Sequence, residues 1–217
     1  MTTLSDNQII ARLQKDLVIK PLNENQFNRN HIQPGSIDLT LWTKLEVIKK
    51  SGLIDIENVS KKNIDDYIEQ IDINDGYNLK PGETVTGYSA EYIEMPLNLN
   101  GAIFNRNSYA MIGIDAGISQ YINPGFKGHK IIVIHNSSPT IVRLVPGIRI
   151  CQLVLFSMGS NSTRSYEERH DIRAFGDSFD LAEEIKKADS NKDLDNPLSD
   201  FMNKRIKQIS EAMINEF

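Results

Sequence analysis

Apolar and polar positions divide the chain into a short helical opening, a long β-type middle and a polar C-terminal part. Four apolar residues between Ile9 and Leu17 recur at helical spacing behind Ser5, a residue type that caps helices. This spacing predicts a helix from about Ser5 to Lys15.

After Pro21 the helical period gives way to a period of two. Three apolar residues alternate with three more polar ones in Ile37, Asp38, Leu39, Thr40, Leu41 and Trp42, which predicts a half-buried strand. Further strand-like runs lie at 84–88, 99–104, 130–135, 140–144 and 149–156, separated by Pro-Gly and Ser-Pro turns. Many short strands with regular turns predict a mainly β fold, a sandwich or closed barrel.

Two segments depart from this pattern. Residues 53–77 are rich in Asp, Asn and Lys and predict an irregular excursion or a short helix. Beyond Gly159 the chain is polar, and its last apolar stripe, from Phe201 to Phe217, predicts a helix. We therefore expect a main domain over residues 1–178 and a C-terminal helical extension over 179–217.

Composition narrows the functional classes. The 217 residues carry a formal charge of −5, which disfavours general nucleic-acid binding and confines any polyanion site to a small basic pocket. Cys151 is the single cysteine; its apolar surroundings predict a buried, inert thiol, and a reducing cytoplasm fits. No apolar run is long enough to span a bilayer, so no membrane segment is expected.

The segment Asn105-Arg106-Asn107-Ser108 interrupts two apolar stretches with an arginine, a hydroxyl, two amides and backbone N–H groups. Such groups suit phosphate oxygens. A tetrapeptide of this kind is also compatible with an ordinary polar turn, and by itself it favours that interpretation.

In the segment from Ile122 to Gly128, Pro124 and Gly125 occupy the positions that a type II turn requires. This predicts a hairpin that presents Gln120, Tyr121 and Asn123 at the rim of a pocket, where the tyrosine ring could pack on a base or sugar.

Asp115, the histidines and the cysteine are candidates for two further kinds of site. Asp115 lies between glycines and could bring a carboxylate to a cation or sugar, although such an aspartate more often caps its own turn. The four histidines show no metal spacing, and one cysteine cannot supply the ligands of a zinc nucleobase deaminase, so no protein-bound metal is expected.

Several segments, in order, resemble the dCTP deaminase branch of the dUTPase superfamily over roughly residues 1–175. They are Leu4-Ser5-Asp6, Ile32-Gln33-Pro34-Gly35-Ser36-Ile37-Asp38-Leu39, Pro124-Gly125-Phe126-Lys127-Gly128 and Pro146-Gly147-Ile148-Arg149-Ile150-Cys151-Gln152-Leu153. The resemblance implies a distorted β-barrel or jelly-roll-like subunit and a homotrimer with sites at subunit interfaces. It also implies a pyrimidine deoxynucleoside triphosphate bound with Mg²⁺.

The resemblance also assigns residues. It places Arg106, Asn107 and Ser108 in the phosphate motif and Gln152 near the phosphates, and it places Tyr166 and Arg173 in the C-terminal segment that covers the nucleotide. Positions where the family carries catalytic groups are substituted: the glutamate that activates water is Val133, the dUTPase aspartate is Asn123, the first motif serine is Asn107 and an arginine is Met111. Valine cannot transfer a proton.

Three functions remain open at this point. The first is a dCTP deaminase-like nucleotide-binding protein, whose family reaction converts dCTP and water to dUTP and ammonia, with Asp115 or another carboxylate from a neighbouring subunit in a catalytic role. The second is a catalytically silent protein that sequesters or senses nucleotides. The third, a dUTPase-like pyrophosphohydrolase, is disfavoured by Asn123.

Overall fold

The computed structural model describes residues 2–20, 31–49, 51–54, 66–118 and 120–166, and the account below is confined to them. Apart from residues 53 and 54, they belong to one compact unit of the chain. Its elements are β1 (Thr2–Thr3), α1 (Asp6–Leu13), β2 (Val18–Lys20), β3 (Ile32–Gln33), β4 (Ser36–Ile48), β5 (Ile68–Asp72), β6 (Tyr77–Leu79), β7 (Thr84–Glu94), β8 (Leu99–Asn105), α3 (Asn107–Ala110), β9 (Ile114–Asp115), β10 (Gln120–Ile122), β11 (Lys127–Asn136), β12 (Val142–Leu144) and β13 (Arg149–Ser157).

Helix α1 begins where the sequence predicts and ends slightly earlier. Its N-cap is Ser5, whose backbone N–H donates to the Gln8 side chain at 2.9 Å, one half of a capping box. The helix ends at Leu13 rather than Lys15, and it buries Ile9 completely against the sheet.

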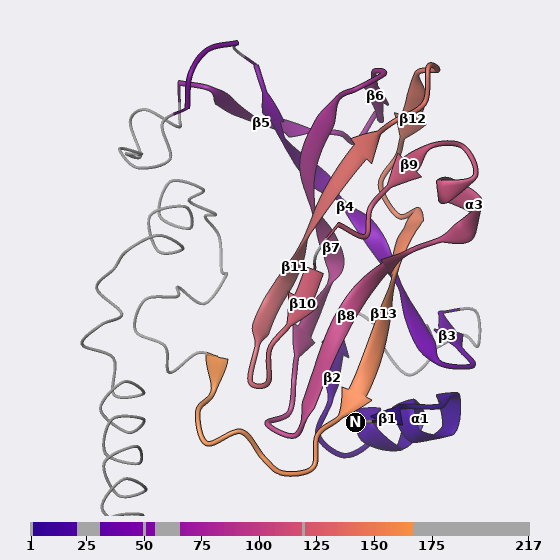
Figure 1. The fold of residues 1–217 in the computed structure, drawn as a ribbon, viewed down its shortest axis with the longest axis vertical. Coiled ribbons are helices and arrows are strands. Elements are labelled where there is room, and N and C mark those ends of the chain that lie inside the picture. The colour runs from indigo at the N-terminus through magenta and orange to yellow at the C-terminus, as the bar shows by residue number, and fades with distance from the viewer. Residues whose placement is uncertain (1, 21–30, 50, 55–65, 119, 167–217) are drawn as a thin grey trace, which may run out of the picture. The chain divides into compact units, whose positions relative to one another are not determined.

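Eleven strands form one curled antiparallel sheet whose main path runs β10-β8-β13-β4-β7-β11-β9, and β6 pairs separately with β12 (Figure 1). Strand β4 is long enough to serve both halves of this sheet: its first part pairs with β13, and its second part pairs with β7 and β5. Register shifts in the β4–β7 and β13–β4 pairs mark the place where the sheet bends. The mainly β, barrel-like fold expected from the sequence is therefore confirmed.

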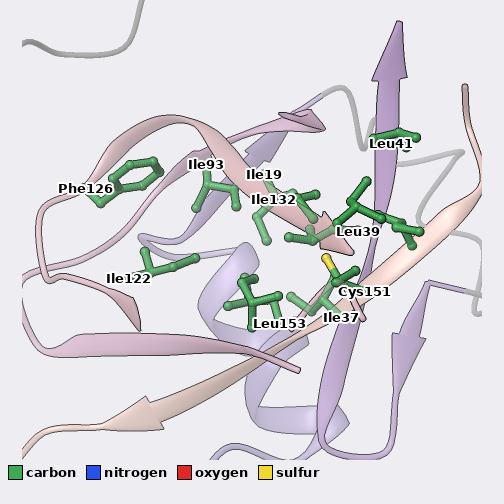
Figure 2. Close-up of a cluster of buried hydrophobic side chains, with 14 of the residues drawn as sticks. Ile19, Ile37, Leu39, Leu41, Ile93, Ile122, Phe126, Ile132, Cys151 and Leu153 are labelled. Atoms are coloured by element: carbon green, nitrogen blue, oxygen red, sulfur yellow. The ribbon is translucent and has the colours of Figure 1, made fainter. Parts of the chain in front are cut away.

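The concave side of the curled sheet is filled by aliphatic side chains from strands far apart in the sequence. Figure 2 shows Ile37 and Leu39 of β4, Ile132 of β11 and Leu153 of β13 meeting there, with the Cys151 sulfur among them. Cys151 is fully buried and unpaired by any disulfide, as the sequence predicts.

Two local predictions are wrong. Residues 68–72 form strand β5 on the edge of β4, because Ile68 and Ile71 find half-buried positions there. Tyr77 begins β6, which pairs with β12. The turn at Pro124-Gly125 is not the end of a paired hairpin: β10 pairs with β8, whereas β11 pairs with β7 and β9.

The turn itself is of the predicted type. Gly125 has φ 74°, and the Phe126 N–H donates to the Asn123 carbonyl at 3.2 Å, which closes a type II turn. The Gly125 N–H also donates to the Met95 carbonyl at 3.0 Å, so the turn is fastened to the end of β7.

The expected C-terminal helix and the domain boundary at residue 178 lie outside the described residues. Among the described residues, no helix is long and apolar enough to cross a membrane.

Candidate functional site

Polar side chains from β4, from β13 and from the residue after β8 gather near one end of the curled sheet. Gln152 of β13 lies directly opposite Asp38 of β4 on one side and Phe104 of β8 on the other. Directly opposed residues project from the same face of a sheet. This pairing therefore gathers Asp38 and Gln152 beside Arg106, which follows β8 immediately.

Asp38 is the centre of this cluster. Its side chain is fully buried, and it meets Arg149 Nη1 at 3.1 Å and Arg106 Nη2 at 3.6 Å, both through Oδ2. Gln33 donates to Oδ2 and Gln152 donates to Oδ1, each at 3.3 Å. A buried carboxylate with two guanidinium partners and two amide donors is well satisfied, so we call these five residues the Asp38 cluster.

The cluster fixes the position of Arg106. Besides its contact with Asp38, the Arg106 guanidinium donates from Nη1 to the Arg149 carbonyl at 2.9 Å. A guanidinium carries five N–H donors, and 22% of the Arg106 side chain stays exposed. The predicted phosphate-binding arginine is thus held from behind by Asp38 while part of it faces solvent.

Residues Asn107 and Ser108 lie directly after Arg106 in the short helix α3, and both are exposed. Arg106 is the N-cap of this helix, and its carbonyl accepts the N–H groups of Tyr109 and Ala110. Met111, where the family has an arginine, is 86% exposed. The tetrapeptide is therefore a strand-to-helix junction rather than a plain turn.

Buried titratable groups line the concave side behind the cluster. Burial raises the pKa of the Cys151 thiol far above its ordinary value, and the nearby carboxylates of Glu91 and Asp38 raise it further. Burial also raises the pKa of Glu91, although Thr40 donates to its carboxylate from N at 2.9 Å and from Oγ1 at 2.7 Å. The thiol is consequently unreactive. Glu91 of β7 accepts the backbone N–H of Thr40 near the place where the β4–β7 pairing is interrupted.

A second group of predicted residues lies elsewhere. Ile122 of β10 is opposite Gly101 of β8, so Asn123 is level with Asn100, six residues before Arg106. At roughly 3.3 Å per strand residue, about 20 Å separates the backbones of Asn123 and Arg106. Within one chain, Asn123 is therefore remote from the predicted phosphate residues, whereas the backbone of Gln120 is opposite Ile103, closer to Arg106.

Tyr166 belongs to this second group. Its backbone N–H donates to the Pro124 carbonyl at 3.1 Å, and its ring lies 5.9 Å from the Phe126 ring. Tyr121 is 52% exposed on β10. Tyr121, Asn123 and Tyr166 thus share the end of the molecule around the Pro124-Gly125 turn.

Asp115 and Val133 have defined surroundings as well. Asp115 Oδ1 accepts the Gly117 N–H at 2.9 Å, so the aspartate caps its own turn. Val133 lies opposite Thr86, on the face away from the buried Ile132 and Ile134. On the same row, Glu46 of β4 accepts the Tyr88 hydroxyl at 2.8 Å, and burial raises the pKa of Glu46.

Sequence reasoning gave no site role to Asp38, Arg149 or Gln33. Asp38 lies between the core residues Ile37 and Leu39 of a strand. The alternating pattern therefore predicts that its carboxylate faces solvent. In the structure the side chains of Arg106, Arg149, Gln33 and Gln152 surround the Asp38 carboxylate and bury it.

Arg173 lies outside the described residues, and of Gln120 only the backbone, paired with Ile103, is described. Within the described ranges, no group of three or more His, Cys, Asp or Glu side chains is placed to hold a metal ion.

Comparisons with known proteins identify relatives of this chain. The dCTP deaminase-like family model matches residues 3–158. A dUMP-forming dCTP deaminase of Methanopyrus kandleri is 32% identical over 173 residues, covering 77% of this chain and 88% of the relative. A second dUMP-forming dCTP deaminase, from Dictyoglomus turgidum, is 33% identical over 170 residues, covering 76% of this chain and 86% of the relative.

Among solved structures, the 2'-deoxycytidine 5'-triphosphate deaminase of Agrobacterium tumefaciens superposes with a TM-score of 0.52 at 20% identity. The match covers 70% of this chain and 47% of that chain, so this chain spans about half the length of that deaminase chain. At this identity the likeness concerns the fold. The family match over residues 3–158 shows that the chain belongs to the dCTP deaminase-like family.

Proposed function

We propose that this protein binds a pyrimidine deoxynucleoside triphosphate, together with Mg²⁺, through the exposed part of Arg106 and its neighbours Asn107, Ser108 and Gln152. The observation that carries the proposal is the Asp38 cluster: a buried carboxylate holds Arg106 at the start of α3. A pre-positioned guanidinium binds phosphate oxygens with little loss of side-chain entropy.

The base and sugar would meet Tyr121, Asn123 and Tyr166 of a neighbouring copy. The separation of about 20 Å along β8 supports this arrangement, since a nucleotide on Arg106 of one chain is remote from the Pro124-Gly125 turn of that chain. A homotrimer with sites between subunits satisfies this requirement.

Deamination by the family's usual route is not expected. Val133 cannot activate water, and Asn123 lacks the carboxylate that a pyrophosphohydrolase would use. Asp115, the replacement considered from the sequence, already uses Oδ1 to cap its turn. These features favour the second candidate, a protein that binds nucleotides and releases them unchanged, and they disfavour the dUTPase-like alternative.

The test is thermal stabilisation by a nucleotide panel with Mg²⁺, combined with chromatography of the recovered nucleotides. At a ligand concentration about 100 times Kd, binding contributes roughly 2.7 kcal/mol, which for a chain of this length corresponds to a rise in Tm of about 5–10 °C. We expect this rise for the wild-type protein and its loss in Arg106→Gln.

Arg143→Gln is the matched control, because Arg143 is an exposed arginine on β12. It should respond to nucleotide as the wild type does. Conversion of dCTP in the same samples would establish catalysis by another group, whereas no stabilisation by any nucleotide would contradict the proposed function.

A further inference from the structure

Lys130 is a charged residue at a position of β11 where the alternating pattern places small or apolar residues. Its neighbours on the concave face, Gly128, Ile132 and Ile134, are all buried. Lys130 shares that side, where burial lowers the pKa of its ammonium to about 8. A lysine in such a position requires either a partner or a function.

The polar partners of the Lys130 side chain are few. Among the described residues, the one hydrogen bond from Nζ goes to the Tyr121 carbonyl at 3.4 Å, and no carboxylate lies within salt-bridge distance. A bond of this length is weak. An ammonium has three N–H donors and no acceptor, so most of its donor capacity is unused.

The place that Nζ reaches is the junction between β10 and β11. The two strands leave the same turn, yet no described ladder joins them. In an antiparallel pair, every second residue of an edge strand directs its backbone groups away from its partner. The Tyr121 carbonyl accepts the hydrogen bond from Lys130 Nζ, so the ammonium reaches the β10 side of this junction.

We propose that Lys130 selects the base of the bound nucleotide, by donating a hydrogen bond to a keto oxygen, so that the site favours a 4-keto pyrimidine over a 4-amino pyrimidine. This inference rests on the proposed function, in which Tyr121 and Asn123 border the base. A keto oxygen accepts from an ammonium, whereas an exocyclic amino group presents only donors and would face the ammonium unfavourably.

Groups on the surrounding strands set the charge of this amine. The Cys151 thiol of β13 is near enough to act on the pKa of Lys130, and burial raises the pKa of that thiol. Glu91 of β7 and Asp38 of β4 act on Cys151 and are engaged by Thr40 and by the Asp38 cluster, respectively. Ser89 of β7 accepts the Lys130 backbone N–H at 2.8 Å.

The test measures the dissociation constants of dUTP and of dCTP for the wild type and for Lys130→Met, with Mg²⁺ at pH 7. Chromatography confirms that each nucleotide is recovered unchanged. Methionine keeps the length and the apolar part of the side chain. We expect the wild type to bind dUTP at least about tenfold more tightly than dCTP, as one charged hydrogen bond allows, and Lys130→Met to bind both about equally. Lys44→Met, which alters an exposed lysine beside Trp42, should keep the wild-type ratio.

Three outcomes separate the possibilities. A wild type that binds dCTP as tightly as dUTP, or a Lys130→Met variant that keeps the wild-type ratio, overturns the role of Lys130 and leaves the proposed function intact. Failure of wild type to bind either nucleotide overturns both.

If Lys130→Met does not fold, the role of Lys130 can be tested in the wild-type protein alone. Acetylation of Lys130 by an N-hydroxysuccinimide ester at pH 8, followed by mass spectrometry, should be slowed several-fold by dUTP and much less by dCTP. Equal protection by the two nucleotides would count against the proposal.

Discussion

Asp38 illustrates how one residue organises the candidate site. Its carboxylate has no contact with solvent and depends on the guanidinium and amide donors of four other residues. Removing the charge of one partner in a buried ion pair leaves the others uncompensated. Asp38 therefore supports both the stability of the β4–β13 region and the position of Arg106.

We expect Asp38→Asn to lower the free energy of unfolding by roughly 3 kcal/mol, because two guanidinium groups lose their carboxylate in a buried setting. Urea denaturation followed by fluorescence measures this change. Asp72→Asn, an exposed aspartate on β5, is the matched control and should have little effect. Equal stability of the two variants would show that the Asp38 cluster is not an important source of stability.

At the scale of elements, the Pro124-Gly125 turn connects strands that do not pair with each other. It is fastened on one side by Met95 at the end of β7 and on the other by the chain around Ser165. A Cβ atom at Gly125 would lie 2.3 Å from Ser165 Oγ and 2.9 Å from Ser165 Cα. The turn thus requires glycine for its positive φ and for close approach of a second segment.

Gly82 allows the requirement for a positive φ to be measured separately from the requirement for space beside the glycine. It has φ 76°, close to the 74° of Gly125, but no atom lies within 4 Å of its virtual Cβ. We expect Gly82→Ala to cost about 1 kcal/mol from φ alone and Gly125→Ala to cost a further 1–3 kcal/mol, approximately, from overpacking. Urea midpoints compare them, and equal losses would mean that residue 165 does not pack on the turn.

At the scale of the whole molecule, the candidate site divides into two groups at different positions along β8. Arg106 lies beyond one end of that strand, while Asn123 is level with Asn100 near the other end. Under the proposed function, one chain holds the phosphate-binding group of one site and the base-edge group of another. We therefore expect nucleotide binding to depend on assembly.

Co-expression of two inactive variants tests this dependence. Arg106→Gln and Tyr121→Ala should each bind poorly, whereas mixed assemblies should recover about one quarter of the sites, since an intact site needs one unaltered group from each of two neighbouring chains. Calorimetric stoichiometry measures the recovery, and native mass spectrometry should report a trimer. Absence of recovery in mixed assemblies would indicate that each site lies within one chain.

Much of the fold followed from local pattern. The capped helix at Ser5, the alternating strand through Leu39 and the type II turn at Gly125 each depend on neighbours within a few residues, and they were predicted correctly. Strand β5 was missed because its isoleucines are separated by charged residues and gain burial only beside β4. The pairing partners of β10 depend on contacts distant in sequence, and the hairpin prediction failed for that reason.

The amino-acid pattern alone was enough to predict the β character of this protein, its family and the residue types available for phosphate and base. Three features needed the folded chain: Asp38 is buried beneath Arg106 and Arg149, Lys130 lies near Tyr121, and Asn123 is remote from Arg106. The physical reason is that local pattern reports whether a residue alternates with its neighbours. Which donors and charges surround it depends on strand pairings between residues distant in the chain.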